Sequence, residues 1–113
     1  MAEAVEGTAR GALEGLRVLE LAEMVAGPYA TKLLADLGAD VVKVEEPGGD
    51  PSRRVGPFVG GQPGPDRSTV FLHCNSSKQS VQLDLTTAEG RAQLAALAAT
   101  VDLVVADLSL IHI

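Results

Sequence analysis

Residues 15–46 read GLRVLELAEMVAGPYATKLLADLGADVVKVEE and carry the pattern of a strand, a helix and a second strand. Residues 18–21 predict a short apolar strand, and residues 41–44 predict another. Between them, Pro28 indicates the start of a helix because its fixed φ suits the first turn. Gly38 indicates the end of that helix, where a positive φ is common. The helix is expected to bury one apolar stripe at helical spacing, made by Ala30, Leu33, Leu34 and Leu37.

This order of elements predicts a βαβ unit, in which the two strands are parallel and the connection is right-handed. Open parallel sheets bind ligands beyond the carboxyl ends of their strands. Residues 22–27 follow the first predicted strand at that edge, and Glu45 and Glu46 end the second. These positions are the first candidates for a binding site.

The second half of the chain repeats the alternation of strands and helices. Residues 80–85 predict a strand with Val81, Leu83 and Leu85 on one face, and residues 102–106 predict another strand. Residues 70–73 are apolar without a clear type. Thr86 and Glu89 match a capping box that starts a further helix. The apolar stripe of that helix is expected to contain Leu94, Leu97, Ala98 and Val101.

Taken together, these elements predict a Rossmann-like α/β fold with three layers and a mostly parallel sheet. We expect residues 1–14 to be a flexible leader and residues 15–107 to be the N-terminal part of a larger domain. The tail at residues 108–113, LSLIHI, is anomalous because domain boundaries are normally exposed and polar. It indicates that the fold is truncated.

Residues 47–67 form the sharpest change in composition. Five of the six prolines and six of the twelve glycines fall there, so regular structure is not expected. A loop of about 20 residues is unusual in a compact domain and is commonly either functional or disordered. Within it, Arg53 and Arg54 suit a phosphate or a carboxylate, because each guanidinium offers a planar fork of donors. The alternative is a solvated surface pair.

Composition excludes several functional classes. The chain has only three aromatic residues and a net charge of −6, both of which argue against a nucleic-acid partner. It has no run of about 18 apolar residues, so a membrane span is not expected. Cys74 is the single cysteine, which fits a reducing, cytoplasmic compartment and a buried core position. His73 lies beside it, but no third ligand is visible and no metal site is expected.

Two motifs carry a resemblance to a known family. Residues 18–54, VLELAEMVAGPYATKLLADLGADVVKVEEPGGDPSRR, resemble the N-terminal signature of the family III CoA transferases, a group that includes the 2-methylacyl-CoA racemases. Residues 75–94, NSSKQSVQLDLTTAEGRAQL, resemble that family's asparagine–lysine–serine strand and the helix after it. The two blocks occur in the expected order and spacing.

The resemblance implies a function that the residues alone do not. An enzyme aspartate would attack an acyl-CoA thioester and accept CoA as an enzyme thioester, from which a carboxylic acid acceptor would take it. No metal or redox cofactor is expected, with CoA bound only as a substrate, and the full-length subunits would form an interlocked homodimer. The catalytic aspartate is expected beyond Ile113 because none of the aspartates in this chain matches its motif. The chain alone is therefore expected to be an inactive fragment with part of the CoA site.

The same resemblance implies which residues contact CoA. Met24, Val25, Ala26 and Gly27 would do so partly through backbone groups, with an ordinary strand-to-helix turn as the alternative. Arg53 and Arg54 would approach the CoA phosphates. Leu83 and Thr86 would lie against the CoA moiety. Glu46 and Asp107 are not expected to contact CoA, because the relatives have other residue types at these positions.

Lys78 is expected to be an edge lysine beside a core strand. A racemase or epimerase remains an alternative function, because it shares the N-terminal motifs. A nicotinamide-dependent oxidoreductase is a rival from another class: Glu45 lies about 20 residues after the first turn, where dinucleotide folds place an acid. The glycine fingerprint of those folds is missing from this chain. The acyl group and its acceptor are not specified by the sequence.

Overall fold

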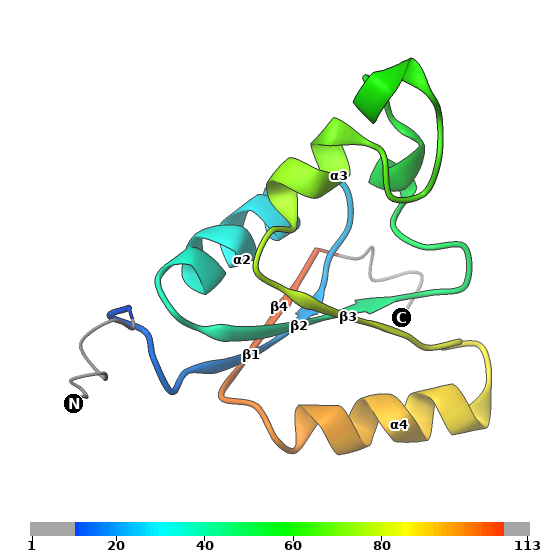
Figure 1. Cartoon of the computed structure of the whole chain (residues 1–113). Coiled ribbons are helices and arrows are strands. Elements are labelled where there is room, and N and C mark those ends of the chain that lie inside the picture. Colours follow the sequence, from blue (N-terminus) through cyan, green and yellow to red (C-terminus); the bar gives the residue numbers. More distant parts are fainter. Residues whose placement is uncertain (1–10, 108–113) are drawn as a thin grey trace.

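The computed structural model describes residues 11–107, which form an α/β fold around one parallel sheet (Figure 1). In chain order the strands are β1 (Arg17–Leu21), β2 (Asp40–Glu45), β3 (Gln79–Gln82) and β4 (Leu103–Ala106). They lie in the order β3-β2-β1-β4, and all three strand pairs are parallel. Helices α2 (Ala26–Asp36) and α3 (Thr69–Cys74) cover one face, whereas α4 (Ala88–Ala98) covers the other. The predicted three-layer architecture is confirmed.

The connections bring the carboxyl ends of all four strands to one edge of the sheet. The chain passes from β1 through α2 to β2, and later from β3 through α4 to β4 on the far side of β1. Residues 22–25, 46–50 and 83–87 therefore lie along the same edge as Asp107. This is the edge where open parallel sheets bind ligands.

Helix α2 begins and ends close to where the sequence predicts, but it buries a different face. Gly38 has a φ of +108° directly after the helix and ends it as expected. The predicted stripe is wrong, because Ala30 is exposed and Leu33 and Leu37 are 45% and 50% exposed. Of that stripe only Leu34 packs against the core. The buried face contains Gly27, Pro28, Thr31 and Ala35.

The small buried face of α2 has a physical reason in the sheet beneath it. That part of the sheet carries charged side chains, and the Thr31 hydroxyl donates a hydrogen bond of 2.7 Å to Oε1 of Glu20. Small residues let the helix backbone approach closely enough for such contacts. A pattern of hydrophobicity alone could not reveal this preference.

Helix α4 packs on an apolar cluster of the sheet, and the predicted stripe is correct except for Ala98, which is exposed. Its Leu94 and Leu97, with Val101, pack against a core of Leu19, Val44 and Leu83. The predicted position of the cap is wrong by one residue. Thr87 is the N-cap, and its hydroxyl accepts the N–H of Gly90 at 3.0 Å. The Thr86 hydroxyl instead donates to Oδ1 of Asp84 at 2.6 Å.

The long loop contains two short 3-10 helices, η1 (Pro51–Arg54) and η2 (Val59–Gly61). Residues 70–73, whose type the sequence leaves open, belong to α3. At the start of the described region, the Leu13 N–H donates to the Leu37 carbonyl at 2.9 Å. Residue 13, which the prediction places in the leader, is thus bonded to the residue that follows α2. The predicted tail and most of the predicted leader lie outside the described residues. Within residues 11–107, no helix combines the length and apolar character needed to cross a membrane.

Candidate functional site

Polar side chains line up across three strands on the face of the sheet under α2 and α3. Glu20 of β1 lies beside Lys43 of β2, which lies beside Ser80 of β3 in the strand register. Glu45 follows two residues after Lys43 and therefore points to the same face. These four residues start a charged network that extends to the carboxyl edge of the sheet.

Two buried lysines share one buried carboxylate in this network. Lys43 Nζ lies 3.0 Å from Oε2 of Glu20, and Lys78 Nζ lies 2.7 Å from Oε1 of the same residue. The side chains of Lys43, Glu20 and Lys78 are at most 2% exposed. Burial lowers the pKa of Lys78, and the ion pair with Glu20 acts in the opposite direction.

Lys78 does lie beside the edge strand β3, but the sequence did not predict that its side chain is buried and paired. Its ammonium also donates to the Pro28 carbonyl at 2.9 Å and to Oδ1 of Asn75 at 2.8 Å. Lys78 thus joins the start of α2 to the turn before β3. Strand edges are often exposed, but here α2 and α3 cover the side chain.

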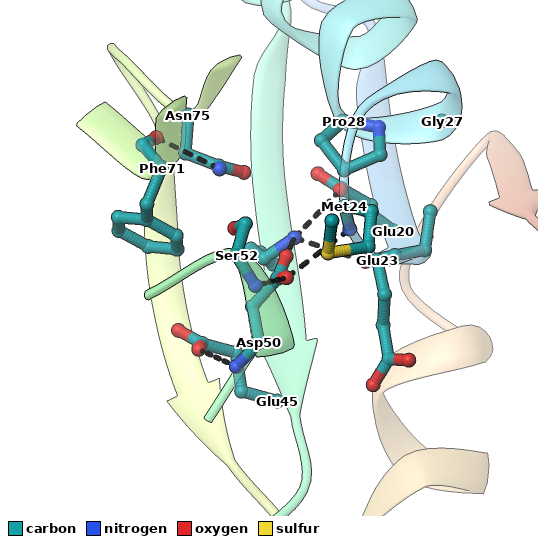
Figure 2. A network of polar contacts seen from close by, with 12 residues as sticks. Glu20, Glu23, Met24, Gly27, Pro28, Glu45, Asp50, Ser52, Phe71 and Asn75 are labelled. Carbon is teal, nitrogen blue, oxygen red and sulfur yellow. Dashed lines mark hydrogen bonds and ion pairs between the residues drawn. The ribbon is translucent and has the colours of Figure 1, made fainter. Parts of the chain in front are cut away.

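Asp50 neutralises the charge of Lys43 and joins two loops (Figure 2). Its Oδ2 lies 2.8 Å from Lys43 Nζ. Its Oδ1 accepts the N–H of Met24 at 3.1 Å and the N–H of Ser52 at 2.8 Å. Burial would raise the pKa of Asp50, but the bonds from Lys43, Ser52 and Met24 lower it below its ordinary value. Asp50 is therefore a buried, charged link between residues 22–25 and η1.

Glu45 and Arg53 form a second ion pair at the end of β2. Arg53 donates to both carboxylate oxygens of Glu45, with Nε–Oε1 at 2.8 Å and Nη2–Oε2 at 2.7 Å. Ser80 donates to Oε2 and the Asp50 N–H donates to Oε1. Burial would raise the pKa of Glu45, but these bonds lower it to about 2. Glu45 is thus occupied by protein partners rather than exposed to a ribose.

Both predicted arginines line pockets at this edge. A pocket of about 280 Å³ is lined by Glu45, Gly48, Gly49, Arg53, Pro65, Ser80 and Gln82. A neighbouring one of about 360 Å³ is lined by Gly48, Arg53, Arg54, Phe58, Pro63, Gly64 and Pro65.

The two arginines differ in how firmly the protein holds them. Besides pairing with Glu45, Arg53 donates to Asp66 at 2.9 Å, and its guanidinium lies 3.7 Å from the centroid of the Phe71 ring. Arg54 is exposed and donates to the Gly48 carbonyl at 3.1 Å. Arg54 therefore has donors better placed for an incoming anion.

The predicted loop of residues 24–27 lies at the carboxyl end of β1, apart from these pockets. Met24 and Val25 are 39% and 49% exposed, and Ala26 is exposed. Gly27 is buried, and a Cβ there would lie 2.3 Å from the Ala22 Cβ and 2.9 Å from Oδ2 of Asp107. Gly27 therefore permits close packing of the helix start against Ala22 and Asp107.

The two remaining predicted site residues lie after β3. Leu83 is only 6% exposed and belongs to the core under α4. Thr86 is exposed and bonded to Asp84. The structure thus brings Arg53 and Arg54 together at the second of these pockets, while residues 24–27, Leu83 and Thr86 lie elsewhere along the same edge.

The carboxyl edge also carries negative charge near β1. Burial raises the pKa of Glu23, and the nearby carboxylates of Asp50, Glu46 and Asp107 raise it further. Among residues 11–107, no group of three or more His, Cys, Asp or Glu side chains could hold a metal ion. Cys74 is buried, as predicted, and the His73 ring stacks on Tyr29 with a centroid distance of 6.0 Å.

Sequence reasoning missed the buried network of Glu20, Lys43, Lys78 and Asp50. A signal was present in the strands themselves. Glu20 and Lys43 interrupt two apolar runs, RVLEL and DVVKVE, with opposite charges. Because buried charges are almost always paired, such interruptions in neighbouring parallel strands indicate an ion pair between them.

Comparisons with known proteins agree with this architecture. The family model for CoA-transferase family III matches residues 13–111. Succinyl-CoA:mesaconate CoA-transferase from Haloarcula hispanica is 50% identical over 95 residues, which are 84% of this chain and 24% of that protein. Succinyl-CoA:glutarate CoA-transferase from Homo sapiens is 43% identical over 95 residues, which are 82% of this chain and 20% of that protein.

A solved structure gives the same result. The crystal structure of a CAIB/BAIF family protein from Brucella suis has a TM-score of 0.72 and 44% identity to this chain, and the match covers 84% of this chain and 25% of that one. The chain thus spans about a quarter of the length of the proteins it matches. Since the family model covers most of its residues, the chain belongs to CoA-transferase family III.

Proposed function

We propose that this chain supplies part of the CoA site of an enzyme that transfers CoA between carboxylic acids. The carrying observation is the pair of pockets beside Arg53 and Arg54, at the edge of the sheet where parallel α/β folds bind ligands. The relatives from Haloarcula hispanica and Homo sapiens are both named as CoA-transferases that use succinyl-CoA, which supports an acyl-CoA donor and a carboxylic acid acceptor.

Within this site, the exposed guanidinium of Arg54 is the group best suited to a CoA phosphate. Arg53 lines both pockets, and its ion pair with Glu45 fixes its position. Backbone N–H groups of residues 25–27 offer further donors at the start of α2, whereas the Met24 N–H is bonded to Asp50. Leu83 and Thr86 would flank the CoA moiety from the β3 side.

The chemistry we propose uses an aspartate outside the described residues. Its carboxylate attacks the thioester carbonyl and releases CoA thiolate, which leaves a mixed anhydride. The thiolate attacks the anhydride at the enzyme carbonyl, forms an enzyme thioester and releases the first acid. The acceptor acid then reverses these steps and leaves as the new acyl-CoA. This is covalent catalysis that splits a difficult exchange into two easier ones.

Two aspartates near the carboxyl edge are already held by protein partners. Asp50 is buried in an ion pair with Lys43, and Asp107 accepts the N–H of Glu23 at 3.1 Å. We therefore expect residues 1–113 alone to give no turnover. In the complete enzyme we expect an interlocked homodimer, no permanently bound cofactor and a cytoplasmic location.

The test uses a chain of full family length that contains this segment. The enzyme is incubated with succinyl-CoA and a panel of carboxylic acids. Liquid chromatography should then detect new acyl-CoA species. Intact-protein mass spectrometry should detect CoA joined to the enzyme, and peptide mapping should locate it on an aspartate. Activity without any enzyme–CoA adduct would contradict the covalent route.

The racemase alternative makes a different measurement decisive. A racemase exchanges the proton α to the thioester, so a 2-methylacyl-CoA in deuterium oxide would gain deuterium at that carbon without any acceptor. Such exchange, together with no CoA transfer to any acid in the panel, would overturn the transferase proposal. A transferase is expected to show the opposite pattern.

A further inference from the structure

We propose that Asp50 is a positioning residue that fixes the loop of residues 22–25 against η1 and thereby sets the affinity for CoA. The effect on affinity rests on the proposed function, because both segments belong to the proposed CoA site. Asp50 itself is 1% exposed and lines neither pocket, so it acts through the groups that it holds.

One carboxylate oxygen joins the two segments directly. Oδ1 of Asp50 accepts the N–H of Met24, at the end of β1, and the N–H of Ser52, in η1 (Figure 2). These residues are 28 positions apart in the chain, yet their amides meet at one atom. Without this acceptor, the two segments would lose their common hydrogen-bond partner.

The rest of Asp50 is held from two further sides. Oδ2 lies 2.8 Å from Lys43 Nζ, which is in turn 3.0 Å from Glu20 and 2.9 Å from the Ala22 carbonyl. The Asp50 N–H donates to Glu45 at 2.7 Å, and Glu45 orients Arg53. The sheet therefore fixes the position of the Asp50 carboxylate. The carboxylate in turn fixes the positions of both loops.

Met24 needs this support because its backbone is in an unfavourable region. It has a φ of +71°, and a side chain with a Cβ rarely adopts that conformation. The hydrogen bond from its N–H to Asp50 favours the strained conformation over extended alternatives. Asp50 thus determines how residues 24–27 present their backbone at the start of α2.

The test compares two double variants that differ only in this acceptor. Asp50→Leu with Lys43→Met removes the carboxylate and its lysine together, so no unpaired charge is left and Glu20 keeps its pair with Lys78. Asp50→Asn with Lys43→Met removes the same charges but keeps an oxygen that can accept the Met24 and Ser52 amides. The matched surface control is Asp36→Asn, since Asp36 pairs with Lys32 on the outside of α2.

We measure amide hydrogen exchange at Met24 and Ser52 and the affinity for CoA in a chain of full family length. The leucine variant should lose protection at both amides and bind CoA at least about tenfold more weakly, with kcat within about threefold of wild type. The asparagine variant should retain the protection and bind within about threefold of wild type. The control should match wild type in both measurements.

Each result supports or overturns a specific part of the proposal. Unchanged protection and affinity in the leucine variant would overturn the positioning role. Equal losses in the leucine and asparagine variants would also overturn it, because the charge rather than the acceptor would then be responsible. If wild type bound no CoA, the proposed function and the effect on affinity would both fall. The exchange data would still decide whether Asp50 fixes the two loops.

Discussion

The two faces of the sheet differ in the polarity of their buried side chains. Under α4, the centre of the sheet presents an apolar cluster that includes Leu19, Val44 and Leu83. Under α2 and α3, the same strands present Glu20, Lys43 and Glu45 beside Val18 and Val41. Because side chains alternate along a strand, a single short sequence supplies both faces. The apolar face stabilises the fold through contacts that do not depend on orientation. The charged face holds particular groups at particular distances.

The difference shows how buried ion pairs can position the loops at a binding edge of the sheet. Burial of apolar area is non-directional and would tolerate small shifts of the loops. Buried ions are costly unless they are paired in good geometry, so they demand one arrangement. The charged face extends to the carboxyl edge through Asp50 and Glu45, and it is this face that positions the proposed CoA-binding loops.

The largest expected effect comes from breaking the charged face at its centre. Glu20→Ala would leave Lys43 and Lys78 buried without their shared carboxylate. We expect a loss of about 4 kcal/mol in the free energy of unfolding, as for other buried ion pairs that lose one partner. Urea denaturation of the family-length protein measures this loss. A loss below about 1 kcal/mol would mean that water or a shift of the lysines replaces the carboxylate.

Breaking the apolar face should cost somewhat less and show no dependence on pH. Leu19 is 1% exposed, and Leu19→Ala should lower the free energy of unfolding by about 3 kcal/mol through lost burial and a residual cavity. The same loss is expected at pH 5 and pH 8, because no ionisable group is removed. The Glu20 variant measured at both pH values provides the comparison. If the loss of unfolding free energy in Leu19→Ala depended strongly on pH, the separation of the two faces would be contradicted.

Acid should weaken the charged face through Glu45. Its pKa is about 2 in the folded protein and 4.5 ordinarily, so the folded state favours the ionised form. The resulting stability is present above pH 4.5 and is lost as pH falls towards 2. Between pH 7 and pH 3 this group alone should cost about 2 kcal/mol. Glu45→Gln should remove that part of the acid sensitivity, and denaturation at the two pH values tests it.

The smallest expected effect concerns the exposed end of the charged region. Arg54→Ala should weaken CoA binding by about tenfold at low salt, because a charge-assisted hydrogen bond to a phosphate is lost. The loss should shrink as salt rises, since exposed charges are screened. Calorimetry at two salt concentrations measures it, with the exposed Arg17→Ala as the control. If Arg54→Ala binds CoA as tightly as wild type at low salt, Arg54 is only a solvated surface residue.

Much of the fold could be read from the sequence because its signals are local. Pro28 marks the first turn of α2 and Gly38 its end, and Leu94 and Leu97 predict the side of α4 that packs on the core. The alternation of residues 80–85 predicts a strand, which the structure has at Gln79–Gln82. The stripe on α2 failed because apolar residues were assumed to face inward. Leu33 and Leu37 are instead exposed, and Thr31 lies against Glu20.

By itself, the sequence determined the four strands and the two long helices along the chain, the parallel sheet and the family, since these depend on periodicity and on short motifs. Only the tertiary structure decided which charges meet. Met24, Lys43, Asp50 and Ser52 are spread over 29 residues, and their contact depends on strand order and register. Local propensity carries no information about such distances. The sequence signals a pair between Glu20 and Lys43, but the contact of Lys43 with Asp50 is decided only by the arrangement of strands and loops in space.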